Sequence, residues 1–155
     1  MLDEAAASGP LDGILVASPA NPSGTVIEPD RMEALMKRAR DLGLWFISDE
    51  IYHGLTYGAP CDTALQHDGE AIVINSFSKY YCMTGWRVGW MVVPDALVRP
   101  IERLAQNIYI SPPALSQVAA LAAFDCVEEL ERNKAVYAKN REILMEALPR
   151  LGLDR

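Results

Sequence analysis

Three short apolar segments constrain the fold of this chain more than any other feature of its sequence. Residues 13–17 read GILVA, residues 44–48 read LWFIS, and residues 71–75 read AIVIN. Nearly continuous apolar runs of this length are typical of strands in a sheet that is covered on both faces. A fourth run, VGWMVV over residues 88–93, predicts a further strand. Such strands, with longer amphipathic segments between and after them, indicate an α/β fold.

Helices are predicted after the first strand and after the fourth. Pro29 suits the first position of a helix, apolar residues recur at helical spacing from Met32 to Leu42, and Gly43 is a natural stop. Further helices are predicted over residues 99–106, from just after Pro112-Pro113 to about Phe124, and over residues 128–148. The last of these carries an apolar stripe, made of Leu130, Val136, Tyr137, Ile143, Leu144 and Leu148.

Composition excludes several classes of protein. The 155 residues are 50% hydrophobic and 23% charged, which is typical of a folded soluble domain and excludes a mainly disordered chain. The net charge of −7 argues against nucleic acid as a partner, because phosphate binding needs clustered Lys and Arg. No apolar run approaches the roughly 18 residues of a membrane helix. The acidic first residues lack a signal core, and three cysteines without motif spacing fit reduced thiols, so we predict a cytoplasmic protein without a membrane partner.

Polar side chains follow three of the predicted strands at the point where each strand ends. In open α/β sheets, ligands bind beyond the carboxyl ends of the strands. We therefore expect these side chains to converge on one edge of the sheet and to form a ligand site. They are Asn21 after the first strand, Asp49, Glu50 and Tyr52 after the second, and Ser76, Ser78 and Lys79 after the third, with Arg87 further on.

Four segments of the chain resemble the fold-type I, pyridoxal-phosphate-dependent aminotransferases of class I/II. They occur in the order and with the spacing of that family, and they are SPANPSGT at 18–25, SDEIY at 48–52, SFSK at 76–79 and TGWRVGW at 84–90. The resemblance covers essentially the whole chain. It implies that residues 1–125 form the central part of a large cofactor-binding domain, with a mostly parallel sheet. Residues 126–155 would then form a long helix that leads towards a truncated small domain.

The resemblance implies a role for each polar residue in binding pyridoxal 5'-phosphate. Lys79 would form a Schiff base with the cofactor aldehyde and later move a proton at the substrate's α-carbon. Asp49 would pair with the pyridine nitrogen, and Asn21 and Tyr52 would bond the phenolic oxygen. Because side chains alternate along an extended chain, only one of Asp49 and Glu50 should face the ring.

The same resemblance implies that Ser76 and Arg87 bind the cofactor phosphate, since the guanidinium fork of arginine matches phosphate oxygens. Ser78 either assists them or only packs. No metal site is predicted, because His53 and His67 show no ligand spacing with the Asp-Glu pair. His53 is expected at the surface or beside the site.

The implied activity is amino-group transfer between an amino acid and a 2-oxo acid, in a homodimer. Three alternatives stay open: a lyase with the same cofactor, an aminotransferase-like sensor domain of a DNA-binding regulator, and a non-catalytic fragment. The sensor reading would require a basic, helical N-terminal module, which this sequence lacks. Family members are more than twice this length, and their substrate-carboxylate arginine lies further downstream. We therefore expect the 155-residue chain alone to be incomplete and weakly active or inactive.

Overall fold

The computed structural model describes residues 2–58 and 61–153 and contains one four-stranded sheet, in the order β1-β2-β3-β4. The first three strands are parallel to their neighbours, and β4 is antiparallel to β3. The predicted α/β fold with a mostly parallel sheet is therefore confirmed. Every strand starts within one residue of its predicted position; the bounds are Gly13–Ala17 for β1, Trp45–Asp49 for β2, Ile72–Ser76 for β3 and Gly89–Val92 for β4.

Five α-helices accompany the sheet in the described residues. They are α1 (Leu2–Ser8), α2 (Pro29–Asp41), α3 (Asp95–Ile108), α4 (Ala114–Ala123) and α5 (Val127–Ala147). Three short 3-10 helices are η1 (Ala64–Gln66), η2 (Thr84–Trp86) and η3 (Leu148–Leu151). In that part of the chain, no helix has both the length and the apolar character needed to cross a membrane.

The helix boundaries differ from the predictions at two places. Helix α1 was not predicted; it is short and none of its described side chains is buried. Helix α3 starts at Asp95, four residues before the predicted start, and Pro100 lies inside it rather than near its beginning. Pro94 directly precedes the helix, so the proline at the helix start is Pro94 and not Pro100. By contrast, α2 ends where predicted, and Gly43 follows it with a φ of +70°.

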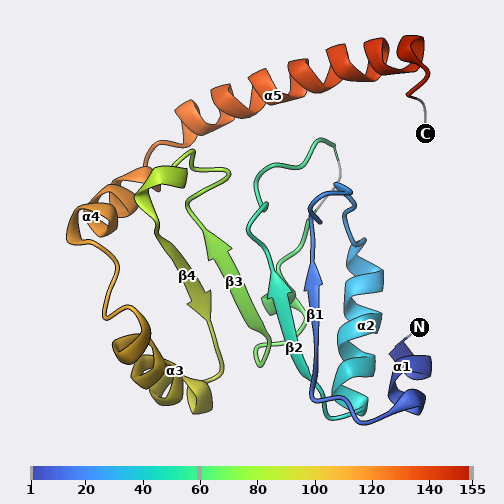
Figure 1. The fold of residues 1–155 in the computed structure, drawn as a ribbon, viewed down its shortest axis with the longest axis vertical. Coiled ribbons are helices and arrows are strands. Elements are labelled where there is room, and N and C mark those ends of the chain that lie inside the picture. Colours follow the sequence, from blue (N-terminus) through green and yellow to red (C-terminus); the bar gives the residue numbers. More distant parts are fainter. Residues whose placement is uncertain (1, 59–60, 154–155) are drawn as a thin grey trace.

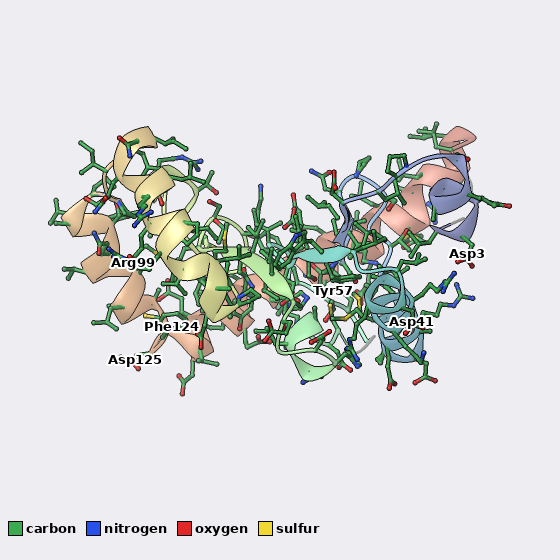
Figure 2. The ribbon with its side chains drawn as sticks, turned by 90° about the horizontal axis from the view of Figure 1, so that it is seen from below. Asp3, Asp41, Tyr57, Arg99, Phe124 and Asp125 are labelled. Atoms are coloured by element: carbon green, nitrogen blue, oxygen red, sulfur yellow. The ribbon has the colours of Figure 1, made fainter. Side chains whose placement is uncertain are left out.

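The described residues form two separate apolar cores. The first joins α2 to the sheet through a set of buried side chains: Met32, Met36, Ala39, Phe46, Ala64, Ala71 and Val73. The second joins the segment after β3 to α4 through Phe77, Met83, Ala120 and Ala123. Figure 2 shows the resulting elongated shape, with Asp3 and Asp41 at one end, Arg99 and Asp125 at the other, and Tyr57 between them.

Helix α5 lies at the end of the molecule toward which β1, β2 and β3 point, as Figure 1 shows. Of its predicted apolar stripe only Leu130 is buried, whereas Val136, Tyr137, Ile143 and Leu144 are exposed. The carboxyl ends of the three parallel strands therefore face a region bordered by a long and mostly exposed helix.

Candidate active site

A pocket of about 340 Å³ lies at the carboxyl ends of β1 and β2. Its walls come from the strand ends and from the segment that follows β3, and the lining residues are Ala17, Pro19, Asn21, Asp49, Ile51, Tyr52 and Lys79. The structure thus brings together four of the predicted site residues: the amide, the carboxylate, the phenol and the amine. These residues come from three different segments of the chain, as expected for polar groups at neighbouring parallel strand ends.

The loop after β1 presents Asn21 by closing on itself. The Ala20 amide donates to the Thr25 carbonyl at 2.9 Å, and the Gly24 amide donates to the Ala20 carbonyl at 2.7 Å. At the base of the loop, buried Ser18 accepts a hydrogen bond at its Oγ from the Ile27 amide at 3.0 Å. Asn21 therefore lies in a turn that is closed by backbone hydrogen bonds between the residues before it and the residues after it.

Asp49 and Glu50 point in different directions at the end of β2, as the alternation of side chains predicts. Asp49 lines the pocket, and its Oδ1 accepts a hydrogen bond from the Ile51 amide at 3.1 Å. Glu50 is 2% exposed and its Oε1 accepts hydrogen bonds from outside the pocket, including one from the Ala64 amide at 2.8 Å. Only Asp49 is thus available to a ligand in this pocket.

Lys79 enters the pocket from the turn after β3. Its Nζ lies 5.4 Å from the centre of the Tyr52 ring, within the range of a cation–π contact. The turn is anchored by Phe77, which is buried and whose carbonyl accepts a hydrogen bond from the Met83 amide at 2.9 Å. The amine and the phenol that the motifs predicted as site residues are therefore neighbours in space.

The residues predicted to bind phosphate form their own cluster and are not among those that line the 340 Å³ pocket. Ser76 Oγ lies 2.9 Å from Ser78 Oγ and accepts a hydrogen bond from the Ser78 amide at 3.0 Å. Arg87 follows η2 with a φ of +50°, and its Nη1 donates to the Thr84 carbonyl at 3.0 Å. Thr84 in turn donates its hydroxyl to the Ser78 carbonyl at 2.6 Å. Hydrogen bonds through Thr84 thus connect Arg87 to the two serines.

A second pocket, of about 450 Å³, adjoins the first and shares Pro19, Asn21 and Tyr52 with it. It extends to Tyr57 and to Arg141 of α5, whose guanidinium carbon lies 6.0 Å from the centre of the Tyr57 ring. Neither residue was predicted as part of the site, because neither belongs to a motif. The sequence predicts the long helix that carries Arg141. Periodicity does not reveal, however, which end of a sheet a helix crosses.

Tyr80, also missed from the sequence, connects three segments around the site. Its hydroxyl donates to Glu131 Oε1 of α5 at 2.6 Å, and its ring lies against Gly54, the last residue of the turn that bears Tyr52. Burial and, secondly, the bond to Glu131 raise the pKa of Tyr80 to about 12. The raised pKa agrees with a phenol hydrogen that Tyr80 donates to the Glu131 carboxylate.

Gly54→Ala should lower the free energy of unfolding by about 1–3 kcal/mol more than Gly58→Ala does, which urea denaturation would measure. A Cβ at Gly54 would lie 2.6 Å from two carbons of the Tyr80 ring. Gly58 is a matched control, because both glycines have positive φ, +89° and +82°, but a Cβ at Gly58 meets no atom within 4 Å. Equal losses in the two variants would show that the Tyr80 ring moves aside at little cost.

The sheet and its pocket define an α/β protein of the kind that binds ligands at the carboxyl edge of parallel strands. Residues 1–155, the whole chain, match the family model described as aminotransferase class I and II. The chain belongs to this family, which confirms the resemblance inferred from its four motifs.

Individual relatives agree with this assignment. The chain is 50% identical over 150 residues to a valine–pyruvate aminotransferase of Mycobacterium tuberculosis, which covers 94% of the chain and 39% of that relative. It is 37% identical to a (5-formylfuran-3-yl)methyl phosphate transaminase of Methanocaldococcus jannaschii, which covers 97% of the chain and 41% of the relative. A crystal structure of an aminotransferase from M. tuberculosis superimposes with a TM-score of 0.90 at 50% identity, over 94% of this chain and 39% of that one. The chain thus spans about 40% of the length of these relatives.

Proposed function

We propose that this chain carries the cofactor-binding part of an enzyme that uses pyridoxal 5'-phosphate to transfer an amino group between an amino acid and a 2-oxo acid. The observation that carries the proposal is the convergence of Lys79, Asp49, Asn21 and Tyr52 on one pocket. The names of the relatives support amino transfer rather than elimination, since each of the two relatives is named for a transamination. Because the chain spans about 40% of their length, the activity is proposed for a whole protein that contains it.

The chemistry of the pocket fits this cofactor. An aldehyde needs an amine partner, which is Lys79, and a pyridine nitrogen needs a carboxylate, which is Asp49. Asn21 and Tyr52 carry side-chain N–H and O–H groups that can donate to a phenolic oxygen. All four line the same pocket of about 340 Å³.

When bound, pyridoxal phosphate supplies an electron-withdrawing ring that stabilises negative charge at the substrate's α-carbon. The Asp49 carboxylate would lie beside the ring nitrogen and would favour the protonated ring. The Lys79 amine would hold the cofactor and, when free, would accept and return a proton at the substrate's α-carbon. Asn21 and Tyr52 would orient the ring from the side of its oxygen.

Ser76, Ser78 and Arg87 are proposed to bind the phosphate. Their support is the hydrogen-bonded cluster next to Lys79, in which one nitrogen of Arg87 is bonded to the Thr84 carbonyl. That bond fixes the guanidinium and leaves its other N–H groups for phosphate oxygens. Arg87 would then neutralise part of the phosphate charge.

Three broader features belong to the same proposal. We infer a cytoplasmic homodimer, and the large apolar side chains exposed on α3 and α4, such as Leu104, Ile108 and Leu115, support an association surface. We also infer that residues 1–125 belong to the large domain and that residues 126–155 lead towards a small domain; the end of the second range lies outside the described residues.

The proposal is tested by incubating a full-length protein that carries this sequence with pyridoxal phosphate, reducing it with borohydride and mapping the modified peptide. We expect the cofactor on the peptide that contains Lys79. A second arm measures conversion of a 2-oxo acid to an amino acid with a panel of amino donors. Cofactor on another lysine, or on none, contradicts the proposal.

A further inference from the structure

We propose that Glu50 is a positioning residue for the cofactor pocket: its buried carboxylate holds the turn that presents Asp49 and Tyr52. This inference rests on the proposed function and adds to it a residue that faces away from the pocket. It begins from an unusual feature, a carboxylate that is 2% exposed although charged side chains are rarely buried without partners.

Every polar group of Glu50 is engaged. Its Oε1 accepts three hydrogen bonds, from Ser48 Oγ at 3.0 Å, Thr63 Oγ1 at 3.1 Å and the Ala64 amide at 2.8 Å. Its Oε2 lies 3.3 Å from His53 Nδ1. Two of these partners are fully buried, since Ser48 and Ala64 are both 0% exposed. Removing one member of such a network leaves the others as buried groups without partners.

The backbone of Glu50 is fixed as firmly as its side chain. Its amide donates to the Ile74 carbonyl of β3 at 2.8 Å, and its carbonyl accepts from the His53 amide at 2.9 Å. Glu50 and His53 are therefore joined twice, once through the backbone and once through their side chains. Tyr52 lies between Glu50 and His53 in the turn, and Asp49 directly precedes Glu50.

Because of these contacts, adjacent residues of the turn have different roles. Asp49 and Tyr52 line the pocket, whereas Glu50 ties their backbone to β2, to β3 and to the turn at the start of η1. The pocket side of the turn has fewer side-chain anchors: Asp49 Oδ1 accepts one hydrogen bond, from the Ile51 amide at 3.1 Å, and Lys79 Nζ lies 5.4 Å from the centre of the Tyr52 ring. The positions of the Tyr52 hydroxyl and the Asp49 carboxylate consequently depend on the buried side of the turn.

The experiment compares the dissociation constant for pyridoxal phosphate and the circular dichroism of the bound cofactor in Glu50→Ala, Glu50→Gln and the parent full-length protein. Glu50→Ala should weaken binding by about 10–100-fold and change the cofactor's dichroism, because removing the groups that orient the ligands of a metal site costs about 10–100-fold in metal affinity and the same logic applies to a turn that orients cofactor ligands. Glu50→Gln should stay within about threefold of the parent, since its amide oxygen can accept the same three hydrogen bonds. Glu33→Gln, on the exposed surface of α2, is the control.

A double-mutant cycle with Tyr52→Phe separates positioning from a general loss of stability. If Glu50 acts through Tyr52, the effect of Tyr52→Phe on cofactor binding should shrink at least about threefold when Glu50 is already alanine. Should Glu50→Ala not fold, Ser48→Ala takes its place in the cycle, because it removes one of the three donors and keeps the carboxylate.

Two results would overturn the inference. Strictly additive effects, or unchanged binding and dichroism in Glu50→Ala, would show that the buried network does not act on the pocket. A parent protein that binds no cofactor would overturn the proposed function as well. The parent and variant arms thus distinguish a failure of the inference from a failure of the function.

Discussion

Lys79→Ala is expected to abolish the borohydride-stable attachment of pyridoxal phosphate and to lower the rate of amino transfer by at least about 10³-fold. General acid–base catalysis alone contributes about 10²–10⁴-fold, and this variant also loses the covalent attachment. Lys79 is the lysine that lines the pocket, together with Asp49 and Tyr52. The measurements are peptide mapping after reduction and the initial rate with saturating amino donor.

Lys139→Ala is the matched control, because Lys139 is exposed on α5 and lies outside both pockets of the site. It should retain the cofactor and the rate. Lys79→Arg adds a second test, since arginine keeps the positive charge but cannot give up its proton to react with an aldehyde. Attachment that persists in either Lys79 variant would contradict the assignment.

Much of the fold could be predicted from the sequence because its strands are short, apolar and separated by clear turn signals. The run at residues 13–17 coincides with β1. The runs at residues 44–48 and 71–75 overlap β2 and β3, and each starts and ends one residue before its strand does. Local signals were less reliable for helices. Pro100 suggested a helix start, yet α3 tolerates it in the interior, where tertiary context overrides the local preference.

The ligand side of the pocket could be predicted, but its support could not. Asn21, Asp49, Tyr52 and Lys79 each lie at or just after the end of a strand, so one rule about parallel sheets brings them together. The partners of Glu50 follow no such rule, because Thr63 and Ala64 approach it from a turn that carries no motif. Arg141 and Tyr57 meet only because α5 crosses the carboxyl end of the sheet. Long-range contacts of this kind depend on the whole fold and not on local spacing.

Asp49→Asn is expected to retain pyridoxal phosphate on Lys79 while the rate of amino transfer falls by about 10²–10³-fold. Removing one preorganised electrostatic group, such as an oxyanion-hole donor, lowers the rate by about this much in other enzymes. Asparagine is the informative replacement, because its side-chain oxygen can still accept the hydrogen bond that Asp49 Oδ1 receives from the Ile51 amide at 3.1 Å. The turn should therefore survive, and only the negative charge that we propose for the ring nitrogen would be lost.

Comparison with Asp49→Ala then separates charge from geometry. Asp49→Ala removes both the charge and the Ile51 hydrogen bond. This variant should therefore bind the cofactor more weakly than Asp49→Asn does, but its loss of rate should be similar once it is saturated with cofactor. Asp125→Asn, at an exposed position between α4 and α5, should leave both quantities unchanged. A nearly full rate in Asp49→Asn would mean that the cofactor ring does not depend on this carboxylate. Because Glu50 is committed to Ser48, Thr63 and Ala64, no neighbouring side chain of the turn is placed to replace the lost charge.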